Sequence, residues 1–443
     1  MNFIEIPVIK FQDLKSELFS EPITEQLEGF AISGVDDVQR NGIHAIRKYN
    51  KDKFNGWYQD LKVDKPTISK AFLSLSDYEK GAMLDFANQI RIKASEQAKR
   101  CLPWTTKIYD LDIDYAMLPL DSVGIYSSPD YPTTVMNVAL MARQAGVRQI
   151  VLATYSKKKV IPNGILAASF LSGIDEVYVM QGRRAIAALA LGLTENDQTI
   201  VPKVDMICGP GGSEVDATKR YVQFKFGTRI DLPAGPSEVA IVAPADYDPK
   251  RVALEMACQC EHGSSSRSIL VTNSTVGIQR MFGYLNDLVG DLNETKKLYV
   301  TEALTKRSRI VLVDTPEEAK EVCDRIAPEI LVIYEDNPDG KNPYLEYFTS
   351  NPPSSGSICC NFSSALSDYG AETCISPTNG SAKYYSKLNV KNFLRQVPIL
   401  RYRDRGLRNQ IWIADQLSQL EGFPLHRMAA TYVDNRGSKN GNS

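Results

Sequence analysis

Residues 123–154 have the sequence VGIYSSPDYPTTVMNVALMARQAGVRQIVLAT. Two short β-rich runs, 123–126 and 148–154, flank a stretch of helical composition at 132–146. Two strands joined by one such helix predict a right-handed βαβ crossover and therefore a parallel sheet. The alternation continues through DEVYVM at 175–180 and VDMICG at 204–209. This pattern predicts an α/β fold.

A second alternating unit follows in the chain. Its β-rich runs include VAIVAP (239–244), SILVTN (268–273) and ILVIYE (330–335), separated by helical stretches such as TPEEAKEVCDRIA (315–327). Residues 1 to about 105, and the end of the chain to about residue 430, have helical composition. We therefore expect two parallel-sheet units with smaller N- and C-terminal helical segments.

Length and composition are those of a soluble enzyme with more than one domain. The chain has 443 residues, of which 43% are hydrophobic and 23% charged, and its net charge is −2. That charge gives no electrostatic reason for a nucleic-acid or anionic-membrane partner, and no apolar run is long enough to span a bilayer. Eight cysteines, two of them adjacent at 359–360, do not look like a disulfide framework. We expect no targeting segment at the start of the chain and a reducing, cytoplasmic compartment.

The stretch CQCEHGSSS, residues 258–266, concentrates potential metal ligands in a chain that has only three histidines. If the stretch is helical, Gln259 and His262 share a face, while Cys260 and Glu261 point elsewhere. The spacing alone fits two interpretations: a metal site, or a half-buried helix end whose histidine binds a carbonyl group.

Two glycine-containing turns raise the question of a phosphate ligand. In CGPGGSEVDATKR (208–220), Gly209, Gly211 and Gly212 could bring backbone amides to a pyrophosphate at a helix N-terminus. The dinucleotide fingerprint requires a glycine where Glu214 stands, so a simple strand-to-helix turn fits equally well. AGPSEV (234–239) either forms a tight turn or presents Ser237 to a ligand.

Taken together, several motifs resemble the histidinol dehydrogenase family over essentially the whole chain. They occur in that family's order and spacing: YPTTVMNVALMARQAGV, CGPGGSEVDATKR, DLPAGPSEV, QCEH, APE at 327–329, SDY at 367–369 and EGFPLH at 421–426. The resemblance implies a zinc-dependent homodimer with shared active sites, acting on a small-molecule amino alcohol with NAD. It also implies two Rossmann-like domains: 31–126 with 236–380, which holds the metal site, and 127–235 on the nucleotide side. Residues 1–30 are then an N-terminal helical segment, and 381–443 a C-terminal helical domain that completes the partner's active site.

The resemblance assigns the zinc ligands to Gln259, His262, Asp368 and His426, and all four are present. Two of the three histidines of the chain fall on the two histidine ligand positions. Two imidazoles, a carboxylate and an amide suit zinc and leave room for substrate. This favours the metal interpretation of the CQCEH stretch over the helix-end interpretation.

The catalytic positions depart from the family pattern. Where the family has Pro-Glu-His, this chain keeps Glu329 but has Ile330 in place of the histidine. A second family histidine falls on Cys374 or on Ile375, depending on the alignment. The family's imidazoles accept the alcohol proton, and isoleucine cannot do so. Glu329 and Cys374 remain as candidate proton relays.

The nucleotide positions are also altered. Tyr126 is kept, but Ser127, Ser128 and Pro129 replace a flexible glycine turn. Arg184 stands at a cofactor-contacting glutamine position, and Gly212 replaces an asparagine. The adjacent Arg183 and Arg184 could favour an anionic ligand, another phosphate pose or NADP. Alternatively, they could reflect drift at an unused site.

The substrate positions are mixed. Ser237, Tyr369 and Glu421 are present, whereas a glutamate expected four residues before Asp368 is Ser364. Three hypotheses follow: an NAD(P)-dependent zinc enzyme that oxidises an alcohol other than L-histidinol, a metal-dependent enzyme that has lost the redox step and uses zinc as a Lewis acid with Glu329, and a non-catalytic relative. Four retained metal ligands favour the first two.

Overall fold

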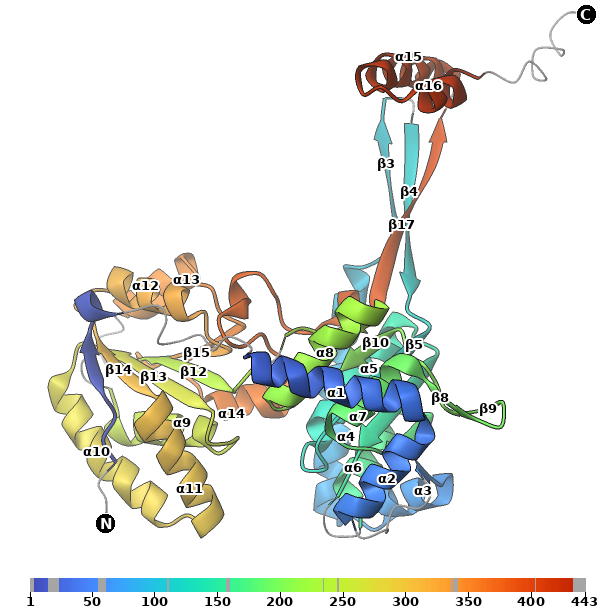
Figure 1. Cartoon of the computed structure of the whole chain (residues 1–443). Helices are drawn as coiled ribbons and strands as arrows, with labels where there is room; N and C mark the ends of the chain where they lie inside the picture. The colour runs from blue at the N-terminus through green and yellow to red at the C-terminus, as the bar shows by residue number, and fades with distance from the viewer. Residues whose placement is uncertain are drawn as a thin grey trace, which may run out of the picture. The chain divides into compact units, whose positions relative to one another are not determined.

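A computed structural model describes residues 4–14, 24–54, 61–109, 111–156, 160–233, 235–244, 247–335, 337, 342–402 and 404–432. The chain divides into two compact units: residues 1–97 with 120–393, and residues 98–119 with 394–443. The first unit contains both large sheets (Figure 1). No described helix is long and apolar enough to cross a membrane. All eight cysteines are unpaired.

The first sheet has six parallel strands in the order β1-β14-β13-β12-β15-β16. Alternate residues of its central strands face two separate cores. Val239 and Ile241 of β12 pack toward α9, α10 and α11, while Ala240 and Val242 pack toward α12 and α13. A sheet covered on both faces explains the unbroken apolar runs in its strands. The strands are β1 Val8–Lys10, β12 Glu238–Val242, β13 Arg267–Thr272, β14 Arg309–Leu312, β15 Ile330–Ile333 and β16 Ser357–Cys360.

The second sheet has the order β11-β10-β5-β6-β7-β2, parallel except for β2, which runs antiparallel to β7. One face packs against α1, α2, α7 and α8, and α5 lies against β5 and β6 on the other (Figure 1). The strands are β2 Lys62–Val63, β5 Ser122–Tyr126, β6 Gln149–Thr154, β7 Glu176–Val179, β10 Met206–Cys208 and β11 Arg229–Ile230, with a separate hairpin of β8 Leu193–Glu195 and β9 Gln198–Val201.

Several helices of the first unit begin with the residues that commonly start a helix. Pro occupies the first turn of α5, α9 and α12, and the side chains of Asp248 and Thr315 cap α9 and α12. The helices are α1 Glu25–Asn41, α2 Ile43–Phe54, α3 Lys65–Leu73, α4 Asp77–Lys99, α5 Pro132–Ala145, α6 Asn163–Leu171, α7 Gly182–Leu191, α8 Ser213–Phe226, α9 Pro249–Cys260, α10 Thr275–Gly290, α11 Glu294–Glu302, α12 Pro316–Ile326, α13 Pro343–Ser350 and α14 Ser364–Leu366.

The second unit combines two segments that lie far apart in the sequence. β3 (Trp104–Ile108), β4 (Leu111–Pro119) and β17 (Leu394–Tyr402) form an antiparallel sheet in the order β17-β4-β3. Two helices, α15 (Asp404–Leu420) and α16 (Pro424–Thr431), pack against each other.

The fold class is confirmed, and some local expectations are corrected. Residues 394–402 were expected in a helical segment but form β17, because pairing with β4 satisfies their backbone. In the expected N-terminal helical segment, residues 8–10 form β1, which pairs with β14. β5 and β2 belong to the second sheet, although the sequence-based boundary at residue 126 assigned them to the first domain.

Candidate functional site

Three of the four expected metal ligands lie in the first unit. Gln259 is in the last turn of α9, His262 lies in the turn that follows, and Asp368 belongs to a π-helical turn, Ser367–Ala371. The Oε1 atom of Gln259 is buried and has no hydrogen-bond partner among the described residues. A buried amide oxygen without a donor is costly unless a ligand satisfies it. The position of this atom therefore fits the role of a metal ligand.

The electrostatics of the other two ligands agree with this fit. The ring of His262 is solvent-accessible, but crowding by protein atoms and the nearby Lys296 lower its pKa, which favours the neutral, metal-binding form. Burial raises the pKa of half-buried Asp368 to about 6, against the opposing charge of Lys387. In the described part of the chain, no three His, Cys, Asp or Glu side chains form a complete metal site. The fourth expected ligand, His426, belongs to the second unit.

Glu329 lies immediately before β15 and is buried. Its Oε2 atom accepts a hydrogen bond of 3.1 Å from the backbone N–H of Glu238, which fixes the carboxyl group. Burial, and next the negative charge of Asp368, raise the pKa of Glu329 to about 8. The carboxyl group is therefore largely protonated at neutral pH and can act as an acid.

The positions that the resemblance assigns to the family's histidines, Ile330 and either Cys374 or Ile375, hold no base. Ile330 is only 1% exposed and packs into the apolar core that faces α9. Cys374 is half-buried, with its Sγ atom 3.5 Å from Thr134 Oγ1 and 3.6 Å from Asn137 Nδ2. Desolvation raises the pKa of this thiol, so it stays protonated. The arrangement gives no support to Cys374 as a proton acceptor.

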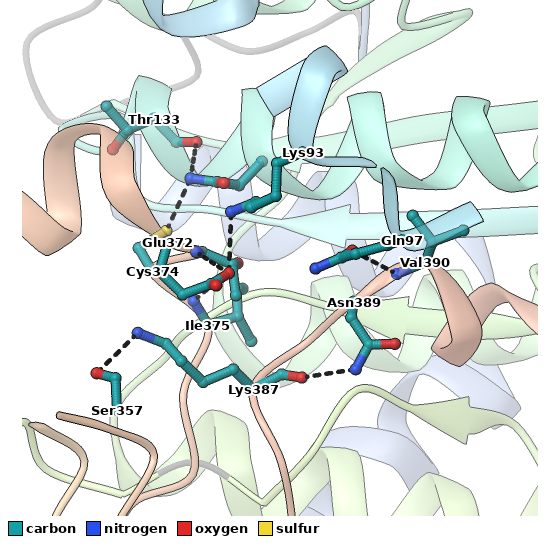
Figure 2. A network of polar contacts seen from close by, with 12 residues as sticks. Lys93, Gln97, Thr133, Ser357, Glu372, Cys374, Ile375, Lys387, Asn389 and Val390 are labelled. Atoms are coloured by element: carbon teal, nitrogen blue, oxygen red, sulfur yellow. Dashed lines mark hydrogen bonds and ion pairs between the residues drawn. The ribbon is translucent and has the colours of Figure 1, made fainter. Parts of the chain in front are cut away.

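The contacts of Cys374 also show that the site spans both sheets. Thr134 and Asn137 belong to α5, which packs on the second sheet. Glu372 forms an ion pair with Lys93 of α4, with 3.0 Å between its Oε1 atom and Lys93 Nζ (Figure 2). The rings of Tyr131, at the start of α5, and His262 lie 6.3 Å apart. The segment around residues 368–374 thus carries the expected metal ligand Asp368 and contacts α4 and α5.

Lys387 is a site residue that sequence reasoning missed. Its side chain is buried, and Nζ donates a hydrogen bond of 3.3 Å to Ser357 Oγ (Figure 2). Its positive charge acts to lower the pKa values of Glu329, Asp368 and Cys374, which places it among them. The only sequence signal is a lysine inside the stretch YYSKLNV, and lysines in such stretches are usually exposed.

On the nucleotide side, a buried ion pair holds the glycine turn. Lys219 Nζ pairs with Asp231 and donates to the carbonyl of Gly209 at 3.0 Å, while Asp231 Oδ2 accepts the N–H of Gly209 at 2.7 Å. Gly209 has a φ of 119°, and a Cβ atom there would lie 1.9 Å from the carbonyl oxygen of Tyr126. Gly212 caps α8, and the hydroxyl of Tyr126 accepts the N–H of Gly182 at 3.0 Å. The sequence reading identified the turn but not the pair that fixes it.

Arg184 is already engaged by the protein. Its guanidinium group forms an ion pair of 2.6 Å with Asp37 of α1 and lies 4.7 Å from the ring centre of Tyr49. The guanidinium of Arg183 lies over the ring of Phe30. Both arginines therefore join α7 to the N-terminal helices, and neither points to NADP in particular.

The remaining expected residues are placed as follows. Ser237 is half-buried just before β12, and Tyr369, next to Asp368, is 70% exposed. Glu421 and His426 belong to the second unit, where both side chains are exposed and the ring of His426 lies 5.2 Å from that of Phe423. The negative charge of Asp368 acts on Glu329 and on Cys258, the neighbour of Gln259, so these three segments lie close together in the first unit. His426 lies at the surface of the second unit.

Comparison with known proteins agrees with this architecture. A family model described as histidinol dehydrogenase matches residues 24–433. The chain is 31% identical over 420 residues to the histidinol dehydrogenase of Dechloromonas aromatica (strain RCB), covering 92% of each protein. It is 32% identical over 399 residues to that of Clostridium acetobutylicum, covering 88% of this chain and 89% of the relative.

Among solved structures, the histidinol dehydrogenase from Elizabethkingia anophelis has a TM-score of 0.85 at 26% identity, with 96% of this chain and 97% of that chain covered. The match of motifs, sequence and fold extends over both units. The chain therefore belongs to the histidinol dehydrogenase family of oxidoreductases.

Proposed function

We propose that the protein is a zinc-containing, NAD(P)-dependent oxidoreductase whose substrate is an alcohol or amino alcohol other than L-histidinol. The observation that carries this proposal is the contrast between two sets of positions. Gln259, His262 and Asp368 keep the chemistry of metal ligands, and Gln259 Oε1 lacks a partner. Ile330, in contrast, has become part of the apolar core. A family member that keeps the metal ligands but lacks the imidazole base is suited to a substrate other than L-histidinol.

The zinc ligands in this proposal are Gln259, His262 and Asp368 of one subunit and His426 of its partner. When bound, zinc supplies Lewis acidity that lowers the pKa of an alcohol. Burial raises the pKa of the Glu329 carboxyl group to about 8, and in its ionised form this group would accept the proton of the alcohol. The nucleotide contacts are Tyr126 and the turn that ends at Gly212, and the substrate contacts are Ser237, Tyr369 and the partner's Glu421.

A homodimer with shared active sites is part of the same proposal. No described side chain of α16 is buried, although several are apolar. Monomers rarely expose apolar side chains in such a concentration, so a second copy of the chain would cover them. The exposed apolar residues of the second unit include Ile399, Leu400, Trp412, Leu417, Leu420, Phe423, Leu425 and Met428.

A second candidate function is a metal-dependent enzyme of the same fold that has lost the redox step. The protonation behaviour of Glu329 favours it, because an acid with a pKa of about 8 can donate a proton to a polarised carbonyl without any nucleotide. The two candidates differ in whether NAD or NADP binds. Thermal melting of the zinc-loaded protein with and without each nucleotide separates them, since a ligand of the folded state raises Tm.

The test of the main proposal is NADH production by the zinc-loaded protein. With L-histidinol, turnover should be at least ~10²-fold slower than that of the Clostridium acetobutylicum relative assayed in parallel, by the usual size of a general-base contribution. A panel of other alcohols should include substrates that the protein oxidises faster. Turnover of L-histidinol near ~10 s⁻¹, a median enzyme rate, would refute the assignment of a different substrate.

A further inference from the structure

The amino-terminal ends of four strands of the first sheet meet beside the candidate site. The register places Glu238 of β12 opposite Arg267 of β13, Val239 opposite Ile330 of β15, and Ile330 opposite Ser357 of β16. Lys387 reaches this edge from outside the sheet, because its Nζ atom donates to Ser357 Oγ at 3.3 Å (Figure 2). A positive charge therefore lies next to position 330.

Lys387 differs from the other buried cations of the described chain. Lys219 is paired with Asp231, and Arg267 lies 3.2 Å from a carboxylate oxygen of Glu238. Lys387 is 8% exposed, yet the one hydrogen bond that its Nζ atom donates among the described residues goes to a neutral hydroxyl group. An ammonium group has three donors, and burying it without a counter-charge is costly. This position therefore favours the binding of an anion.

The nearby carboxyl groups are engaged elsewhere. Glu372 is paired with Lys93 and accepts the N–H of Thr373. Glu329 accepts the N–H of Glu238, and Asp368 is an expected metal ligand. None of these three carboxyl groups forms an ion pair with Lys387 in the described part of the chain, although its charge acts on all three, so N–H donors of its ammonium group remain for a ligand.

We propose that Lys387 is a specificity-determining residue that binds a carboxylate group of the substrate. The substrate class is then an alcohol that also carries a carboxylate, a hydroxy acid. The identification of this ligand as a substrate rests on the proposed function, whereas the binding of the carboxylate does not. Because Lys387 lies beside position 330, the carboxylate and the hydroxyl group would belong to one small molecule.

The test compares three ligands of the same size on the zinc-loaded, full-length protein: lactate, the neutral lactamide and the cationic 1-amino-2-propanol. Calorimetry without nucleotide measures their affinities for the wild type, Lys387→Met and Lys387→Arg. Lys383→Met is the matched control, since Lys383 is an exposed lysine of the same segment. Zinc content and Tm establish that each variant is folded, which methionine in place of a buried cation should allow.

The wild type should bind lactate more tightly than either analogue. Lys387→Met should weaken lactate binding by about 10- to 150-fold, the range for a hydrogen bond to a charged group, with little change for lactamide. Lys387→Arg should retain much of the affinity, and Lys383→Met all of it. Equal lactate affinity in the wild type and Lys387→Met would overturn the proposal, because zinc alone would then hold the carboxylate. A wild type that prefers 1-amino-2-propanol would overturn it too.

The carboxylate site at Lys387 and the proposed redox function can be refuted independently of each other. If lactate binds through Lys387 but no hydroxy acid is oxidised with NAD or NADP, the carboxylate site stands and the redox function is wrong. If neutral alcohols are oxidised at rates that Lys387→Met leaves unchanged, the redox function stands and the role of Lys387 is wrong.

Discussion

Replacing Lys219 by methionine tests how strongly the buried ion pair supports the glycine turn. The side chains of Lys219 and Asp231 are each 1% exposed, so the variant leaves a carboxylate buried without a counter-charge. Among the described residues, Asp231 would keep its hydrogen bonds from the N–H groups of Gly209 at 2.7 Å and Leu232 at 2.8 Å. Breaking a buried pair in this way destabilises a protein by about 3–5 kcal/mol. At ~2–4 °C per kcal/mol for a domain of 150–250 residues, Tm should fall by roughly 6–20 °C.

A second change should recover part of that loss. Asp231→Asn removes the stranded charge and keeps an acceptor for the N–H of Gly209, so the double variant should be ~2 kcal/mol more stable than Lys219→Met alone. Thermal melting followed by circular dichroism gives the order of stability, and hydrogen exchange at Gly209 and Leu232 shows whether the loss is local. A single variant within about 1 kcal/mol of the wild type, or a double variant less stable than Lys219→Met, would contradict the reasoning.

Three further predictions concern other parts of the molecule. The folded-state pKa of Glu329, about 8, is above its ordinary value of 4.5. Keeping this group protonated in the fold therefore lowers the free energy of unfolding increasingly as pH rises from about 4.5 to about 8, and has no such effect below about pH 4.5. In zinc-free protein, Glu329→Gln should therefore gain stability over the wild type between pH 5 and 8, and a difference that does not change with pH would count against this. Mixing His262→Ala and His426→Ala subunits should restore a fraction of zinc sites measurable by elemental analysis, and no recovery would show that both ligands come from one chain. Gly209→Ala should lower Tm and weaken nucleotide binding, because its Cβ would lie 1.9 Å from the carbonyl oxygen of Tyr126; a Tm equal to that of wild type would exclude this clash.

The central βαβ elements were predictable because both faces of their sheets are covered. The run at 148–154 became β6, Gln149–Thr154, and the helical stretch at 132–146 became α5, Pro132–Ala145. Most residues of these elements are buried, so their composition is set by the core and is visible in the sequence.

The second unit could not be predicted in the same way. β17 is mostly exposed and contains Pro398, so its sequence carries little of the alternation that marks a half-buried strand. Its structure is defined by a partner strand that lies in a distant part of the chain. Local composition contains no information about such a partner, which is why the stretch was assigned to a helical segment.

For the site, the motifs identified residues but not their surroundings. Gln259, His262 and Asp368 were found through the family resemblance, whereas Lys219 and Lys387 were missed because lysine is almost always a surface residue. Arg184 was found, but its ion pair with Asp37 was not, since that pairing depends on how α1 packs. Burial and pairing of charged side chains are tertiary properties that a single sequence does not reveal.

The pairing of β4 with β17 has a consequence for biosynthesis. Leu111 lies opposite Tyr402 and Pro119 opposite Leu394, so the paired strands are roughly 280 residues apart in the order of synthesis. At about 5–20 residues per second, a ribosome needs ~15–60 s to complete the partner of a β4 strand that has already left the exit tunnel. During that time β4 and β3 can form only a two-stranded hairpin, which is marginal in water. Both sheets of the first unit are complete in sequence by residue 360, so they can assemble on the ribosome while this hairpin waits, a period in which chaperones would protect it from pairing with other nascent chains.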